Sequence, residues 1–367
     1  MLWWRRRTGP MSLASLRQAL LAWFDAHARA FPWRQNRNPY RIWVSEVMLQ
    51  QTQASTVVPY FNRFIARFPA VESLAAAPVA EVLKAWEGLG YYRRAHNLHK
   101  AAQIIVAEHG GVVPNEQRAL LSLPGIGRYT AGAIRSIAFN QPAPVLDGNI
   151  KRVISRLDDL EANIDEAATQ RRLWTRAAEL VDPQRPGDFN EALMELGAAI
   201  CLPRNPACHL CPVQDLCLAR QRGTQYERPI RNPRRRIPHY DVAAGIVWHA
   251  SQPDQFLIAQ RPEKGMLGGL WEFPGGKQEP NETLPETLKR ELCEELGIEV
   301  EVREPLVSID HAFTHFRITL HAYHARHIGG EPQCLEVDDW RWITLTEADG
   351  FAFGKTDRRI IGALLAK

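Results

Sequence analysis

The chain has 367 residues, of which 45% are apolar and 23% charged, as in folded proteins rather than disordered or fibrous ones. This length exceeds one ordinary domain and predicts two or three. No apolar run reaches the roughly 18 residues that a membrane-spanning helix needs, and mean hydropathy is −0.30. The N-terminus lacks a secretory apolar stretch. We therefore expect a soluble, cytoplasmic protein with no membrane contact.

Charge is distributed unevenly along the chain. Residues 1–240 carry 32 lysines and arginines against 20 acidic residues, whereas residues 241–367 carry 13 against 21. Seven arginines and one glutamate lie within residues 220–236. The change of sign predicts two domains, the first suited to a polyanionic partner, although solvated surface charge would give the same imbalance.

The first part of the chain is predicted to be mostly helical. Apolar residues recur at helical spacing in several segments between residues 12 and 200. The expected helices cover residues 16–27, 43–58, 79–86, 98–109, 117–122 and 128–138. Pro59 is expected to end the second helix and Gly110-Gly111 the fourth.

The second part of the chain has the pattern of a mixed α/β domain. Residues 219–240 hold prolines among arginines, with few apolar residues, and are predicted to be a linker. Strands are expected over residues 242–248, 256–261, 300–309, 316–323 and 337–343, with one helix over 283–296. The expected division is a first domain over 12–218, the linker, and a second domain over 241–365.

Four of the six cysteines fall within 17 residues in a C-x6-C-x2-C-x5-C pattern. They are Cys201, Cys208, Cys211 and Cys217. Four thiolates on so short a loop point to a metal centre. Zinc and unliganded thiols remain alternatives, but zinc sites usually use two close pairs, and a reducing cytoplasm disfavours disulfides. The spacing resembles the iron–sulfur loop of the endonuclease III and MutY family of DNA glycosylases, which implies a 4Fe–4S cluster.

A second motif lies between two of the expected helices. Residues 123–128 (LPGIGR) place Gly125 and Gly127 before Arg128 at a helix start, where uncovered backbone N–H groups suit a phosphate oxygen. A proline-bearing loop, residues 140–149, follows and contains Asp147. The order of hairpin, loop, aspartate and four cysteines is similar to that of the helix–hairpin–helix glycosylase superfamily.

Within that superfamily the chain resembles the adenine glycosylases of the MutY branch. The resemblance covers nearly all of residues 12–218 and is strongest over residues 43–53 (WVSEVMLQQTQ) and 88–100 (GLGYYRRAHNLHK). Members that attack the sugar with an amine carry a lysine where this chain has Tyr129, and a phenol cannot form a Schiff base. The resemblance therefore implies a monofunctional hydrolase of base excision repair that removes adenine opposite 8-oxoguanine or guanine in duplex DNA.

The residue types fit this chemistry, because cleaving a purine glycosidic bond creates an anionic base and an oxocarbenium-like sugar. By position in the family, Glu46 would be the proton donor and water activator, Asp147 would stabilise or trap the sugar cation, and Asn149 would orient Asp147. A helix-start carboxylate and a helix cap are the structural alternatives for the two acids. The implied base pocket comprises Arg34, Leu49, Glu191 and Tyr129. The implied DNA contacts are Gln51, Tyr91, Gly125, Gly127, Arg128 and Arg204.

The second domain contains a complete Nudix box over residues 276–298. Glu291, Glu294 and Glu295 share one helix face, and such carboxylates suit Mg²⁺, although a solvated helix would show the same charges. In the MutY branch this Nudix-like domain recognises 8-oxoguanine and its box is usually incomplete. The intact box leaves pyrophosphate hydrolysis of oxidised nucleotides as an alternative activity, and we do not expect Mg²⁺ to be needed by the glycosylase.

Residues 311–316 (HAFTHF) resemble the Phe-Ser-His loop with which the family senses oxidised guanine. The implied recognition residues are Phe313, Thr314 and His315, with threonine in place of serine. Thr314 keeps a hydroxyl that can hydrogen-bond to the lesion.

The expected architecture is thus a mostly α helix–hairpin–helix glycosylase followed by an α/β Nudix-like domain. We expect a monomer that acts on double-stranded DNA near the nucleoid. A bifunctional glycosylase of endonuclease III type is an alternative. A non-catalytic DNA-binding module would leave Glu46 and Asp147 unexplained.

Overall fold

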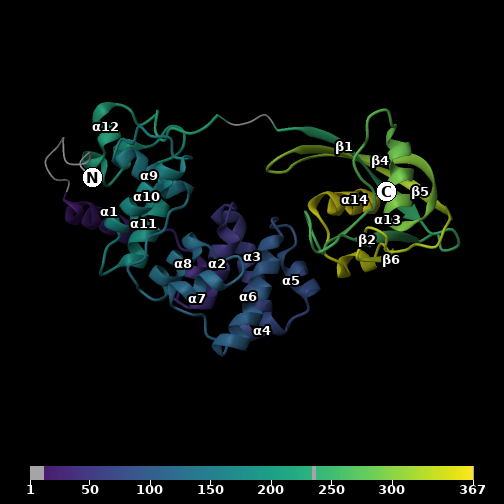
Figure 1. Ribbon diagram of the computed structural model, residues 1–367, viewed down its shortest axis with the longest axis horizontal. Coiled ribbons are helices and arrows are strands. Elements are labelled where there is room, and N and C mark those ends of the chain that lie inside the picture. The colour runs from purple at the N-terminus through teal and green to yellow at the C-terminus, as the bar shows by residue number, and fades with distance from the viewer. Residues whose placement is uncertain (1–11, 234–236, 367) are drawn as a thin grey trace. The chain divides into compact units, whose positions relative to one another are not determined.

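The structure is a computed structural model that describes residues 12–233 and 237–366. It divides into two compact units, residues 1–75 with 100–234 and residues 76–99 with 235–367 (Figure 1). The arginines at 234–236 of the expected linker lie outside the described residues. None of the helices in the described ranges is long and apolar enough to cross a membrane.

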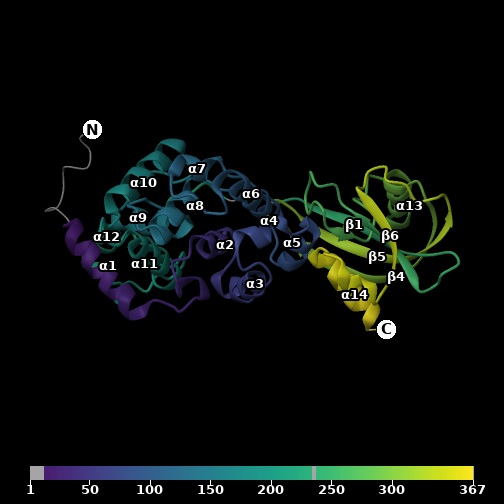
Figure 2. The ribbon, with the colours of Figure 1, turned by 90° about the horizontal axis from the view of Figure 1, so that it is seen from below.

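Residues 12–222 are built of helices and connecting loops (Figure 2). The helices are α1 (Leu13–His27), α2 (Pro39–Leu49), α3 (Ala54–Arg67), α4 (Val71–Ala76), α5 (Val79–Trp86), α6 (Arg93–His109), α7 (Gln117–Ser122), α8 (Arg128–Ala133), α9 (Gly148–Leu157), α10 (Ala167–Leu180), α11 (Pro186–Ala199) and α12 (Leu218–Arg222). In the first unit, apolar faces of α1, α9, α10 and α11 share one core, which also includes Ile42 of α2.

The prediction of a single helix over residues 43–58 is wrong. The segment 43–58 forms the end of α2 and the start of α3, separated by a break at residues 50–53. The break falls where Gln51 adopts a left-handed backbone with φ 59°, a conformation that ends a right-handed helix. Pro59 lies inside α3 rather than ending it, so the tertiary packing of α3 outweighs the hydrogen bond that proline cannot donate.

The helix–hairpin–helix prediction is confirmed. The first helix is α7, and α8 continues into a π-helical turn over Ile134–Ala138. Between them, Gly125 has φ 77°, which favours glycine, and Gly127 caps the N-terminus of α8 with extended backbone. The hairpin therefore presents backbone at the start of a helix, as expected.

Most of the expected linker packs against the first unit. Arg228 is 7% exposed and pairs with Asp159 at 2.9 Å, while the Ile230 carbonyl accepts the Ile164 N–H at 2.9 Å. The part of the expected linker around Arg228 and Ile230 thus belongs to the folded first unit. At the other end of the expected linker, His239 already begins the first strand.

The second unit contains a six-stranded mixed sheet. The strands are β1 (His239–Trp248), β2 (Gln255–Gln260), β3 (Trp271–Glu272), β4 (Glu299–Ala312), β5 (Arg317–Gly329) and β6 (Asp339–Thr344). Their order is β3-β2-β1-β5-β4, with β6 also paired to β2; β1 and β5 are parallel and the other pairs antiparallel. The five expected strands are confirmed, and the two-residue β3 is too short to show a sequence period.

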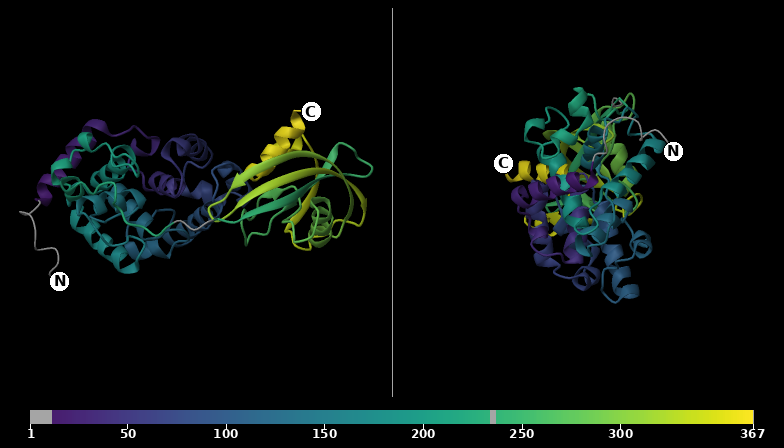
Figure 3. Two further views of the ribbon diagram at one scale, coloured as in Figure 1. Left: turned by 90° about the horizontal axis from the view of Figure 1, so that it is seen from above. Right: turned by 90° about the vertical axis from the view of Figure 1, so that its left-hand side faces the viewer.

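A helix covers each face of this sheet (Figure 3). Helix α13 (Leu284–Leu296) packs on Ala243 and Val247 of β1, whereas α14 (Lys355–Leu365) packs on the opposite face, with Ala244 and Ile246. The alternation of β1 side chains between two apolar layers explains its continuous apolar sequence. The β4–β5 hairpin ends at residues 313–316, where Phe313 and Phe316 pack against the core on the α14 face.

Residues 76–99 are held to the rest of the second unit by polar contacts. Glu87 forms ion pairs with Arg358 and, at 2.7 Å, with Lys84, whose ammonium also donates to the Phe351 carbonyl at 3.0 Å. The His96 Nε2 atom lies 2.9 Å from the Gly268 carbonyl. These contacts place Tyr91 beside the β4–β5 hairpin, with its hydroxyl 3.0 Å from that of Thr314.

Candidate functional site

A buried carboxyl group lies on the α2 helix. Glu46 is 4% exposed, and its Oε2 accepts a 2.8 Å hydrogen bond from the Tyr129 hydroxyl on α8. Burial raises the pKa of Glu46 to about 7; the Tyr129 bond opposes this rise, and the carboxylates of Glu191 and Asp147 add to it. At neutral pH this side chain is therefore balanced between acid and carboxylate, the condition under which one group can both donate and accept a proton.

The second predicted acid is held by the start of α9. Asp147 is the N-cap, and its carboxylate accepts the Ile150 backbone N–H at 2.7 Å and the Asn149 side-chain amide at 3.0 Å. Burial raises the pKa of Asp147, while these hydrogen bonds act in the opposite direction. Asn149 in turn accepts from Arg152 at 2.9 Å. The cap and the amide fix the orientation of the carboxylate.

Helix packing around Asn149 depends on a glycine that the sequence did not single out. A Cβ atom at Gly197 of α11 would lie 2.6 Å from the Cβ of Asn149. Only glycine allows α11 to approach the start of α9 so closely. Nothing in the local sequence distinguishes Gly197 from a glycine in an exposed helix.

A cavity of about 240 Å³ lies beside Glu191. The Arg34 Nε donates to Glu191 at 2.7 Å, and its guanidinium lies 5.2 Å and 5.1 Å from the ring centres of Phe24 and Phe31. The cavity is lined by Phe24, Ala28, Arg29, Trp33, Arg34, Asn36, Arg37, Ile42, Ile137, Asp188 and Glu191. Two expected pocket residues are therefore brought together, whereas Leu49 is half-buried at the end of α2 and does not line this cavity.

Sequence reasoning missed Arg29 and Trp33 as cavity residues. Both lie in residues 29–37 (RAFPWRQNR), a segment rich in arginine and aromatic side chains. This composition could have indicated a binding pocket. Arg29 pairs with buried Glu195, which also binds Arg34 at 3.2 Å. The cavity wall is thus a network of alternating charges and aromatic faces.

The expected DNA-contact residues are at the surface. In the first unit Gln51, Arg128 and Arg204 are exposed, and the Arg128 guanidinium lies 4.0 Å from the Trp174 ring centre. In the second unit Tyr91 is 43% exposed and has a left-handed backbone with φ 51°. Because Gln51 and Tyr91 have left-handed φ values, their side chains point in directions that a continuous right-handed helix would not allow.

The expected lesion-recognition residues form the tip of the β4–β5 hairpin. Thr314 and His315 are exposed and Phe313 is half-buried, with its N–H bonded to the Phe316 carbonyl at 2.9 Å. The rings of Phe313 and Phe316 lie 4.8 Å apart. We call residues 313–316 the recognition loop. The two tilted rings support the base of the loop, where the exposed Thr314 lies.

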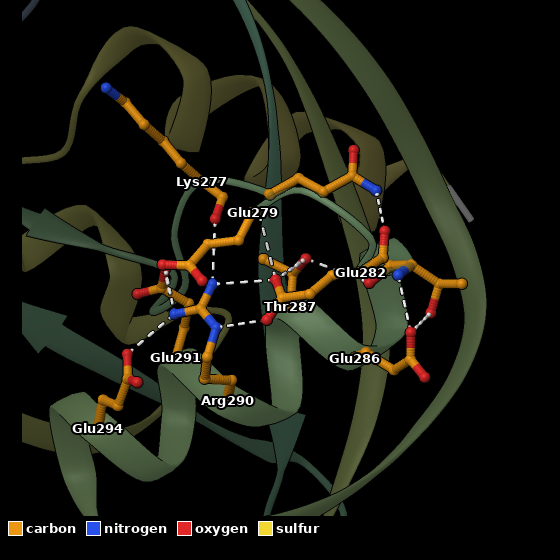
Figure 4. Close-up of polar contacts among 10 residues, drawn as sticks. Lys277, Glu279, Glu282, Glu286, Thr287, Arg290, Glu291 and Glu294 are labelled. Carbon is orange, nitrogen blue, oxygen red and sulfur yellow. Dashed lines mark hydrogen bonds and ion pairs between the residues drawn. The ribbon is translucent and has the colours of Figure 1, made fainter.

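The Nudix-box glutamates surround an arginine (Figure 4). Arg290 contacts Glu282 at 2.6 Å, Glu294 at 2.9 Å and Glu291 at 3.1 Å. Glu295 is not among these partners; it accepts the Gly275 N–H at 3.2 Å, and burial together with the nearby carboxylates of Glu272 and Glu291 raises its pKa to about 8. Three of the box glutamates therefore share one arginine, whereas Glu295 lies nearer to Glu272 and Glu291.

The four clustered cysteines lie on a loop that leaves α11 and leads to α12. Arg156 donates to the Cys201 sulfur at 3.2 Å, and backbone N–H groups of Val213 and Arg220 point at the sulfurs of Cys211 and Cys217. Burial raises the pKa of Cys211 to about 12, and the other three thiols add to the rise, which shows that the four are neighbours. Donors aimed at sulfur stabilise the thiolate form in which cysteine binds iron.

Comparisons with known proteins match these parts of the chain. Family models match a HhH-GPD superfamily base excision DNA repair protein over residues 44–179, the iron–sulfur binding domain of endonuclease III over 201–217 and a NUDIX domain over 243–363. The adenine DNA glycosylase of Rattus norvegicus is 37% identical over 391 residues, covering 91% of this chain and 75% of that protein. The Homo sapiens adenine DNA glycosylase is 37% identical over 390 residues, covering 91% and 71%.

The chain belongs to the adenine DNA glycosylase family. A solved structure of a thermostable thymine-DNA glycosylase is also similar, with 32% identity and a TM-score of 0.52 over 57% of this chain and 97% of that chain. The expected fold class, a helical glycosylase followed by a Nudix-like domain, is confirmed. The match over residues 201–217 indicates an iron–sulfur cluster in this chain, and the thiol groups of the four cysteines in that segment fit such a group.

We predict that Cys208→Ser removes the iron–sulfur centre, because serine cannot replace the thiolate ligand. Purified parent protein should be brown and contain iron and sulfide, and the variant should lose most of both, as measured by chemical iron and sulfide assays. Cys293→Ser, at an exposed cysteine outside the loop, is the matched control and should retain them. Stoichiometric zinc in anaerobically purified parent would contradict the assignment.

Proposed function

We propose that this protein hydrolyses the N-glycosidic bond of adenine mispaired with 8-oxoguanine or guanine in duplex DNA. The observation that carries the proposal is the buried Glu46 carboxyl, with a pKa of about 7, beside Tyr129 and near Asp147. Membership of the adenine DNA glycosylase family supports adenine as the excised base. The opposite base is inferred from the recognition loop.

In the proposed reaction Glu46 donates its proton to N7 of adenine as the glycosidic bond breaks. The bonding electrons leave with the base, and positive charge develops on the sugar, where the fixed Asp147 carboxylate faces it. The Glu46 carboxylate then takes a proton from the attacking water. Asn149 holds Asp147 in place. Because Tyr129 offers no amine, the proposed enzyme makes no Schiff base and cleaves no strand.

Adenine must leave the duplex before it can react. We assign the charged and aromatic cavity at Arg34 and Glu191 to the wall of the base pocket, with Leu49 at its edge. Gln51 and Tyr91 would fill the space left in the stack; their exposed, left-handed positions support this role. Gly125, Gly127, Arg128 and Arg204 would bind phosphates, since they present backbone N–H groups or charge at the surface.

The second unit would recognise the base opposite adenine. The exposed Thr314 hydroxyl, supported by Phe313 and beside His315, can hydrogen-bond to an oxidised guanine edge. Its 3.0 Å contact with the Tyr91 hydroxyl supports joint action of the two residues on one lesion. We propose that the enzyme works as a monomer with a 4Fe–4S cluster on Cys201, Cys208, Cys211 and Cys217, and that residues 12–218 and 241–365 divide excision and recognition between them.

Mg²⁺ has no part in the proposed excision. The proposed proton donor and the sugar-stabilising carboxylate both belong to the first unit, whereas Glu291, Glu294 and Glu295 belong to the second. We therefore derive no catalytic step through a metal at the Nudix box. Release of pyrophosphate from 8-oxo-dGTP with Mg²⁺ would instead support the nucleotide hydrolase, and strand cleavage without alkali would support a bifunctional glycosylase.

We predict that Glu46→Gln lowers the single-turnover rate of adenine release at least about a hundredfold, because the amide cannot donate the proton. Binding to the same duplex should persist, since Glu46 is buried and makes no surface charge. Glu108→Gln, an exposed carboxyl on α6, is the control and should excise normally. Undiminished excision by the Glu46 variant would refute the role of this carboxyl.

The recognition role predicts a loss of selectivity in Thr314→Val, which keeps the shape of the side chain and removes its hydroxyl. The ratio of excision rates opposite 8-oxoguanine and opposite guanine should fall roughly fivefold to tenfold, as expected for one hydrogen bond. Thr314→Ser keeps the hydroxyl and should preserve the ratio. Equal ratios in the valine variant and the parent would show that another group senses the lesion.

A further inference from the structure

The intact Nudix box fixes the position of a neighbouring lysine. Arg290 binds Glu282 through both carboxylate oxygens, at 2.6 and 3.1 Å, and donates to the Lys277 backbone carbonyl at 3.2 Å (Figure 4). The Ala243 N–H of β1 bonds to the Gly276 carbonyl at 2.9 Å. The backbone of Lys277 is thus held from α13 on one side and from the sheet on the other.

The Lys277 side chain extends from this fixed backbone to the recognition loop. Its ammonium lies 4.0 Å from the ring centre of Tyr240 and 5.4 Å from that of Phe316. The two rings are 5.9 Å apart in an edge-to-face arrangement, and Phe316 contacts Phe313 inside the loop. Cation–π attraction to two faces restricts the ammonium while leaving its N–H donors accessible.

Among the residues that the structure describes, no acidic side chain is paired with Lys277. Lys277 is exposed and forms no ion pair with any residue in the described ranges. This contrasts with Arg290, which has three carboxylate partners. An ammonium group that is held in place and has no acidic partner can bind an anion of another molecule.

The surroundings of the recognition loop are basic although residues 241–367 as a whole are acidic, with 13 lysines and arginines against 21 acidic residues. Burial, together with Lys355 and Arg359, holds the pKa of His311 below its usual value, which places both cations near the loop. Four cations, Lys277, Arg317, Lys355 and Arg359, lie at this end of the sheet, where Asp241 and Asp310 are also found. The excess of positive charge would favour the approach of DNA here over other parts of this acidic unit.

We propose that Lys277 binds a backbone phosphate of the DNA strand whose base the recognition loop reads. The rings of Tyr240 and Phe316 restrict its ammonium group, and Arg290 holds its backbone. This inference rests on the proposed function. The partner is a duplex phosphodiester, because one ammonium at a basic rim provides positioning charge and no base-specific pair of contacts. Arg290 of α13 thereby serves lesion recognition by holding the Lys277 backbone.

Equilibrium binding to a duplex with adenine opposite 8-oxoguanine tests this, using full-length protein that carries Glu46→Gln to prevent turnover. Adding Lys277→Gln should weaken binding roughly fivefold at low salt and reduce the slope of log affinity against log salt by about 0.9, the value for one lost phosphate contact. Lys289→Gln, an exposed lysine on α13, is the matched control and should leave the slope unchanged.

The supporting residues have a distinct signature. Tyr240→Leu should weaken binding while keeping most of the slope, because the charge remains but is less restricted. An unchanged slope in Lys277→Gln overturns the proposal, as does a change in the preference for 8-oxoguanine over guanine without a change in slope, which would mean a base contact. Unaltered duplex binding with loss of Mg²⁺-dependent 8-oxo-dGTP hydrolysis would assign Lys277 to a nucleotide and also overturn it.

Failure of this proposal is distinguishable from failure of the proposed function. The parent protein, with Glu46 intact, either excises adenine opposite 8-oxoguanine or does not, whatever the slope of the Lys277 variant. Normal excision by the parent with an unchanged slope rejects only the phosphate contact.

Discussion

The burial of one carboxyl group between α2 and α8 is the constraint on which the site depends. In water Glu46 would be ionised at neutral pH, and desolvation removes that preference. The cost of burial is limited by the Tyr129 hydroxyl, which offers a hydrogen bond to either charge state of the acid. The helix–hairpin–helix turn is therefore more than a DNA contact, because it delivers Tyr129 to this position at the start of α8.

The second acid depends on helix geometry. An N-cap aspartate is a common structural device, and at Asp147 the cap also orients the carboxylate. Its support extends inward: Asn149 binds Arg152, and Arg152 donates to the Cys201 carbonyl at 2.7 Å at the edge of the cysteine loop. Polar contacts thus join the start of α9 to the iron–sulfur loop, and the fold of that loop contributes to the placement of Asp147.

Motifs with fixed spacing predicted the local structures they encode, since hairpin, box helix and cysteine loop are determined by a few neighbouring residues. The break between α2 and α3 was not predicted, because the residue with the left-handed backbone is Gln51 and not a glycine, the residue type that indicates such a conformation. The cavity residues Arg29 and Trp33 and the glycine contact at Gly197 arise from tertiary packing, which local periodicity does not encode. The Nudix box shows another limit: its spacing predicts which glutamates share a helix face, but not that Arg290 pairs with Glu282, Glu291 and Glu294.

The account is tested most directly by the pH dependence of single-turnover adenine excision opposite 8-oxoguanine. If Glu46 is the proton donor, the rate constant should fall about tenfold per pH unit above about pH 7, where burial places its pKa. At low pH the rate should fall again as Asp147 becomes protonated. A rate that stays level from about pH 6 to about pH 9, across the range in which a buried acid must lose its proton, would contradict the central role of the Glu46 carboxyl.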